Sequence, residues 1–222
     1  MSHFFTTLQE ATRPAREAML SAPIVAACER GDISLTQYHR FLSQAYHHVK
    51  HTVPLLMACG SRLGESHEWV RAAIAEYIEE EIGHHEWILN DIQACGGDAE
   101  AVRNNQGEGA MGMPIELMLA YLYHNIDRGH PMALFGMVWV LEGTSVGIGA
   151  QVAKQVKNTL NLDDESLTYL TSHSELDQDH IRFFAELMDK VENPQEQAAI
   201  IDAANMVFHL YGQMLHSLTA SV

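Results

Sequence analysis

The sequence predicts an all-α protein, and three observations support this prediction. Apolar residues recur at spacings of three and four along nearly the whole chain, which is the period of one helix face. Alternating runs and Asn-Gly turns, which would indicate strands and hairpins, are absent from the sequence. The 222 residues include only 6 Pro, so long stretches are free of the strongest helix breaker. We expect a bundle of about seven to eight helices, forming a single domain over residues 1–222.

Capping residues, prolines and glycines mark the expected helix ends. Helices are expected over 8–20 and 23–30, followed by a long helix that begins at the cap Ser34 and runs to Cys59. The next begins near the cap Ser66 and ends at Gly96-Gly97, where glycine permits a left-handed exit. A polar, glycine-rich loop at 98–113 with at most a short turn precedes helices at 114–128, 131–158, about 163–190, and from the Asn193 cap with Pro194 to near the C-terminus.

Composition excludes several classes of protein. Lys and Arg total 13 against 29 Asp and Glu, a formal charge of -16, so a nucleic acid would be repelled. Three dispersed cysteines without a CxxC pair, and an N-terminus unlike a signal peptide, indicate a cytoplasmic protein. Residues 131–150 are long enough to span a membrane, but Glu142 in their middle favours a buried helix instead.

The segment YIEEEIGHHEW, residues 77–87, is the first cluster of metal-ligand types. Glu81 and His84 are three residues apart and would share one helix face. Glu80 with His84, and Glu81 with His85, are four apart and are alternatives. The same run of charges is also typical of a solvated helix face.

A second cluster, His173, Asp177 and His180, has the spacing i, i+4 and i+7 and would form one stripe of a helix. Imidazole with carboxylate suits iron, manganese or zinc. A solvated polar stripe is the alternative, because other polar residues populate the segment.

Glu142 is the only charged residue in PMALFGMVWVLEGTSVGIGA, so we expect it to be buried. A buried carboxylate binds a metal, pairs with a partner or stays protonated. The alternative to a ligand is a structural carboxyl bonded to a neighbouring helix. Together the three clusters are similar in style to the inward-facing ligands of di-iron helical bundles.

Two segments carry a family resemblance. LQEATRPAREAML and WVLEGTSVGIGAQVAK resemble the first helix and the glycine-containing distal helix of bacterial heme oxygenases. The resemblance runs in order over most of the chain and implies the heme oxygenase-like helical bundle. Where heme oxygenases present the axial histidine of the first helix, this chain holds Arg16, with no histidine before His39 apart from His3 at the N-terminus, so we expect no heme.

The set Glu81, His84, Glu142, His173, Asp177 and His180 is similar to the metal-binding pattern of the heme oxygenase-like di-iron oxidases and oxygenases, with His85 as the rival of His84. That resemblance implies two iron ions, the second bound more weakly, and an oxidoreductase that uses O2 on a small organic substrate. Helical surfaces of this kind are compatible with a homodimer. The rivals are a cofactorless PqqC-like or TenA-like enzyme on the same fold, and a non-catalytic helical metal-binding protein.

Overall fold

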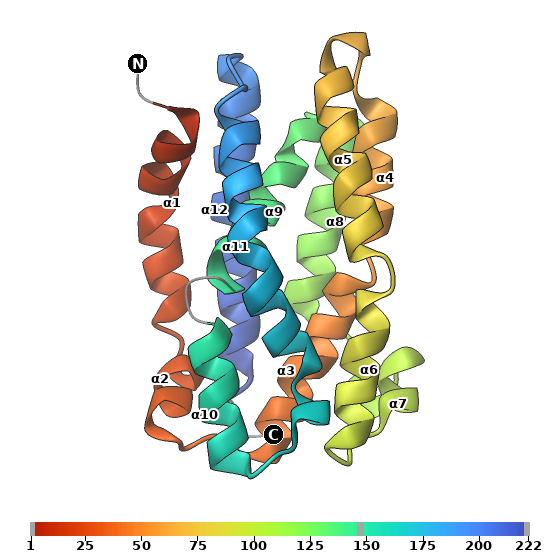
Figure 1. Ribbon diagram of the computed structural model, residues 1–222, viewed down its shortest axis with the longest axis vertical. Helices are drawn as coiled ribbons and strands as arrows, with labels where there is room; N and C mark the ends of the chain where they lie inside the picture. The colour runs from red at the N-terminus through yellow and green to blue at the C-terminus, as the bar shows by residue number, and fades with distance from the viewer. Residues whose placement is uncertain (1–2, 146–148, 220–222) are drawn as a thin grey trace.

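The structure is a computed structural model that describes residues 3–145 and 149–219, and for residues 173–180 it describes the backbone alone. Within these residues every regular element is a helix, which confirms the all-α prediction. The long helices run roughly along the long axis of the molecule (Figure 1). Helix α12 (Pro194–Ser217) is central, because it packs against α1 (Phe4–Leu20), α8 (Met113–Arg128) and α9 (Leu134–Thr144). The helices outnumber the seven to eight expected, because three of the expected long helices are interrupted and the expected loop at 98–113 contains a short helix of its own.

The expected helix 34–59 is two helices, α3 (Leu35–Val49) and α4 (Thr52–Arg62). The predicted start is confirmed: Ser34 Oγ accepts a hydrogen bond from the Gln37 N–H at 3.2 Å, and Gln37 Oε1 accepts one from the Ser34 N–H at 2.9 Å. Pro54 explains the interruption, because its ring would clash with the carbonyl of residue 50 in a continuous helix and it has no N–H to donate.

The expected helix 66–97 is also divided, into a short 3-10 turn (Glu65–His67), α5 (Glu68–Glu81) and α6 (His84–Ala94). The Ser66 cap was wrong, because His67 occupies the N-cap position of α5. Gly83 has φ +93°, a left-handed conformation that glycine adopts without strain and that ends a helix. The predicted exit is confirmed, with Gly96 at φ +80°.

The expected helix 131–158 begins as a 3-10 turn (Pro131–Ala133), continues as α9, and resumes as α10 (Ala150–Leu160), with residues 146–148 outside the described part of the chain.

The loop at 98–113 contains α7 (Ala99–Arg103) and a 3-10 turn (Gly107–Gly109). Helix α2 (Pro23–Arg30) is as predicted, and α11 (Thr168–Met188) follows a 3-10 turn (Asp164–Ser166). The Asn193 cap of α12 is confirmed, because its side chain accepts from the Gln195 N–H at 2.9 Å.

Two hydrophobic cores hold the helices together. The larger core joins α1, α4, α5, α8, α9 and α12 with the end of α11, and the smaller one joins α2, α3, α6 and α10 with the start of α11. Helices α2 and α10, which the sequence separates widely, lie together in the lower part of Figure 1. Among the described residues, none of the helices combines the length and apolar character needed to span a membrane.

Candidate functional site

A cavity of about 200 Å³ lies where the two cores meet. Its wall is mostly apolar and comes mainly from α2, α3, α9, α10 and α12, with smaller parts from α4, α5 and α11. Phe41, Leu56 and Met137 are among the lining residues. An engineered apolar cavity of about 150 Å³ binds benzene, so this volume suits a small organic group. A concave, apolar pocket with few polar groups is the usual form of a small-molecule site.

Two carboxylates reach this cavity from different helices. Glu81 is the last residue of α5, and Glu142 lies in the last turn of α9. Glu142 is partly buried, and its Oε2 atom is inaccessible to solvent. Residues 134–140 of α9 are all buried, so the Glu142 carboxylate belongs to a helix that runs through the core of the bundle. Glu142 was expected to be buried, and the structure bears this out only in part, because one carboxylate oxygen is inaccessible while the residue as a whole is half-buried.

Glu81 and His84 are side by side although a helix break separates them. The Nδ1 atom of His84 lies 3.3 Å from Oε2 of Glu81, and their side chains are 6% and 13% exposed. The ring of His84 also packs on Trp87, with centroids 4.0 Å apart. The sequence predicted this pair on one continuous helix face; the structure instead brings the two side chains together across the turn at Gly83.

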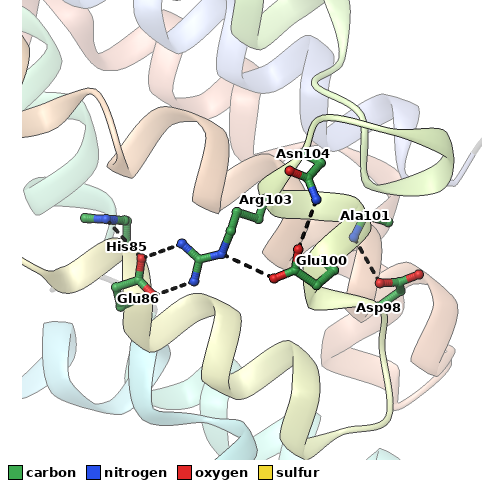
Figure 2. Close-up of polar contacts among 7 residues, drawn as sticks. All are labelled: His85, Glu86, Asp98, Glu100, Ala101, Arg103 and Asn104. Atoms are coloured by element: carbon green, nitrogen blue, oxygen red, sulfur yellow. Dashed lines mark hydrogen bonds and ion pairs between the residues drawn. The ribbon is translucent and has the colours of Figure 1, made fainter.

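His85, the rival ligand, lies on the outside of α6. Its side chain is 37% exposed and its Nε2 atom is 3.4 Å from Oε1 of Glu86. Figure 2 shows Arg103 bridging Glu86 and Glu100, so that this surface cluster ties α6 to α7. Arg103 donates two hydrogen bonds to Glu86, at 2.9 and 2.7 Å. His85 therefore belongs to a surface network, whereas His84 lies beside Glu81.

The side chains of His173, Asp177 and His180 lie outside the described residues. The backbone of α11 is helical throughout Thr168–Met188, which is the setting that their spacing assumed, and α11 packs against both α6 and α9. Among the described side chains, no group of three His, Cys, Asp or Glu residues is arranged to hold a metal ion. Glu81, His84 and Glu142 thus do not form a complete three-residue site by themselves.

Two further residues of the cavity wall carry chemistry that the sequence did not single out. His48 of α3 is 2% exposed and packs edge-on against Tyr211, with centroids 5.6 Å apart. Tyr77 lies one turn before Glu81; burial raises its pKa, and the charges of Glu142 and other nearby carboxylates raise it further. The sequence does place Tyr77 one helical turn before the candidate ligand Glu81, and this spacing could have identified Tyr77 as a residue of the site.

Cys28 of α2 also lines the cavity. Burial raises the pKa of its thiol, and the nearby charge of Glu29 raises it further. The thiol form therefore predominates at neutral pH, which disfavours both metal binding and nucleophilic attack by this sulfur.

A family model described as "iron-containing redox enzyme" matches residues 39–212. The chain belongs to this family. The match covers most of the chain, including all six candidate ligands, and confirms the family that the sequence resembles. The comparison with curated proteins gives no match.

Solved structures confirm the heme oxygenase-like fold. A domain of unknown function from Shewanella denitrificans aligns with TM-score 0.83 and 22% identity, covering 96% of this chain and 90% of that one. A TenA homologue from Pseudomonas syringae aligns with TM-score 0.80 and 13% identity, covering 96% and 91%. A heme oxygenase from Synechocystis in complex with heme aligns with TM-score 0.76 and 13% identity, covering 98% and 93%. At these identities the likeness establishes the fold alone.

Proposed function

We propose that the protein is an O2-dependent non-heme iron oxidoreductase that acts on a small, largely apolar organic substrate. Glu81, His84 and Glu142, together with His173, Asp177 and His180 of α11, would hold two ferrous ions. The observation that carries this proposal is that Glu81 and Glu142, from different helices, line one apolar cavity in a chain of the iron-containing redox family.

The described part of the proposed ligand set fits iron. Carboxylates at an apolar cavity lose hydration, and a divalent cation between them offsets that cost. Imidazole and carboxylate together are the donors of non-heme iron, whereas calcium takes oxygen ligands alone. His84 beside Glu81 supplies this mixture within one turn of chain.

The protein's own groups would then shape the reaction. The apolar wall excludes water and positions the substrate against the carboxylate end of the cavity. Tyr77, with its raised pKa, stays protonated and can donate a hydrogen bond, while the imidazole of His48 is placed to give or take a proton. When bound, iron supplies the electrons that activate O2, and a separate reductant would restore it.

The proposal retains the expectation that heme is not the cofactor. Helix α1 contains no histidine, and among the described residues His48 is the one histidine that lines the cavity. Titration with hemin tests this point: a sharp Soret band in the wild type that is lost in His48→Ala would contradict the non-heme assignment. Nucleic acid and membrane partners are not part of the proposal, and a homodimer is compatible with it.

Anaerobic reconstitution with ferrous iron, followed by metal analysis and an absorption spectrum on exposure to O2, tests the proposed centre. We expect close to two irons per chain and a visible band that forms and decays. Glu142→Ala and His173→Ala should lower the iron content and abolish iron-dependent O2 uptake while helicity is retained. Glu116→Ala is a matched control, because it removes an exposed carboxylate of α8. Unchanged iron content and O2 uptake in both site variants would refute the ligand assignment.

A cofactorless reaction in the same cavity is the second candidate, and the presence of His48 and Tyr77 in the wall favours it. These two groups could act as general base and general acid on a bound substrate without a metal. Activity that survives exhaustive chelation but is lost in His48→Ala would support this candidate against the iron enzyme. Activity lost on chelation and restored by ferrous iron would support the iron enzyme.

A further inference from the structure

The start of α11 has no cap of its own. Its N-cap residue is Leu167, whose side chain makes no capping hydrogen bond. Leucine has no oxygen to accept from the first N–H groups of a helix, which normally require an acceptor. The local sequence therefore leaves the beginning of this helix unsatisfied.

Asp91 of α6 supplies the missing acceptors from a distant part of the chain. Its Oδ1 atom accepts from the Thr168 N–H at 3.1 Å and from the Thr168 hydroxyl, and its Oδ2 atom accepts from the Tyr169 N–H at 2.8 Å. Asp91 is 0% exposed, so no water competes for these bonds. A negative charge is also favoured at the positive end of a helix dipole.

Tyr38 of α3 reinforces the same junction. Its hydroxyl donates to the Ser166 carbonyl at 2.7 Å, and its side chain is 3% exposed. Tyr38, Tyr169 and Leu170 all line the cavity. The hydrogen bonds of Asp91 and Tyr38 therefore lie directly behind one wall of the proposed site.

We propose that Asp91 is a positioning residue that caps α11 and thereby sets the place of α11 against α6. This inference rests on the proposed function, because α6 begins with His84 and α11 carries three of the other five candidate ligands. At a rise of 1.5 Å per residue, His84 lies about 10 Å before Asp91 along the axis of α6, and residue His173 lies about 7.5 Å beyond Thr168 along the axis of α11. Seven residues are close to two helical turns, so His84 and Asp91 are on the same side of α6.

Asp91→Asn is the direct test, because it keeps the size of the side chain but replaces one acceptor oxygen with a donor. The matched control is Asp189→Asn at the other end of α11, where the carboxylate accepts from the Phe5 N–H at 3.0 Å and contacts His3. Both variants remove one carboxylate that joins α11 to another helix. Only Asp91 lies behind the cavity wall.

Hydrogen exchange of the metal-free protein is the first readout. Asp91→Asn should accelerate exchange of the first turn of α11 by about tenfold or more, because one of the two amides that Asp91 serves there loses its acceptor, and Asp189→Asn should leave it unchanged. The second readout is anaerobic titration with cobalt(II), whose visible spectrum reports ligand geometry. Partners that orient metal ligands change affinity by about 10–100-fold, and we expect about tenfold weaker cobalt binding and an altered spectrum in Asp91→Asn alone.

Unchanged exchange in Asp91→Asn would overturn the capping role. Faster exchange with unaltered cobalt affinity and spectrum would overturn the positioning role and leave Asp91 merely structural. If Asp91→Asn does not fold, Thr168→Val decides, because it removes one hydroxyl donor and retains both backbone bonds; we expect the same effects at smaller size. A wild type that binds neither cobalt nor iron defeats the proposed function, while the exchange comparison still decides whether Asp91 caps α11.

Discussion

Gly136→Ala should separate α9 from α12 and disturb the Glu142 end of the cavity. Gly136 is buried in α9, and α9 packs on the central helix α12. A Cβ atom at this position would lie 2.5 Å from the Ala204 nitrogen and 2.6 Å from the Ile200 carbonyl oxygen. Both are backbone atoms of α12, so no side chain can rotate to relieve the contact.

The expected loss of stability follows from two opposing effects. Overpacking of this kind costs about 1–3 kcal/mol, occasionally more, and contact with rigid backbone puts this site near the upper end. Alanine in a helix gains about 1 kcal/mol over glycine, which leaves a net loss of about 2 kcal/mol. For a chain of this length that corresponds to a Tm lower by about 4–8 °C. Glu142 lies six residues further along α9, about 9 Å away along the axis, so displacement of the helix should also weaken iron binding.

Thermal unfolding followed by circular dichroism measures the effect, and Gly60→Ala is the matched control. Gly60 is also helical, but a Cβ atom at that position would meet the Ile74 side chain at 3.7 Å, which is an ordinary contact. The control should therefore keep or slightly raise the Tm. A Gly136→Ala protein as stable as the wild type, with unchanged iron content, would refute the close approach of the two helices.

Two further predictions concern histidines. His84→Ala should lower iron content after anaerobic reconstitution, whereas His85→Ala should leave it unchanged, because His84 lies beside Glu81 and His85 is at the surface; equal losses in both variants would contradict this distinction. Burial lowers the pKa of His47, only partly offset by its hydrogen bond to the Gly109 carbonyl, while the unfolded chain keeps a value of about 6.5. The stability due to neutral His47 is thus complete above about pH 6.5 and is lost as the pH falls below it. Urea unfolding at about pH 7.5 and 5.5 should show a smaller difference between the two pH values in His47→Gln than in the wild type, and an equal difference would count against the buried neutral imidazole.

The sequence could predict those helix ends that are marked by a capping side chain or a glycine within the same turn. The Ser34 cap, the left-handed exit at Gly96 and the Asn193 cap are all present, because each depends on residues within one turn. The interruptions at Pro54 and Gly83 were missed. Both residues are visible in the sequence as helix breakers, but the apolar period continues across them, and periodicity alone favoured unbroken helices.

The sequence could predict some residues of the candidate site but not others. The sequence could direct Glu142 toward the interior because a lone charge in an apolar helix has no solvated face to occupy, and the cavity wall does include it, although the residue is only half-buried. His48 could not be distinguished from its neighbours in the same way, because its segment also contains His47 and His51. His47 is bonded to the Gly109 carbonyl at 2.7 Å and His51 to Tyr123 at 3.0 Å, and these partners come from parts of the chain that no local pattern connects.

The break at Gly83 changes how the first cluster should be interpreted. On an unbroken helix, spacings of three and four are nearly equivalent, so the sequence could not choose between His84 and His85. With α5 ending at Glu81 and α6 beginning at His84, the direction of each side chain is set by its own helix and by the turn between them. The left-handed Gly83 turns His84 toward Glu81 and leaves His85 beside Glu86. The pairing of Glu81 with His84 is therefore a consequence of the turn, and the residue that determines it is a glycine that carries no chemistry itself.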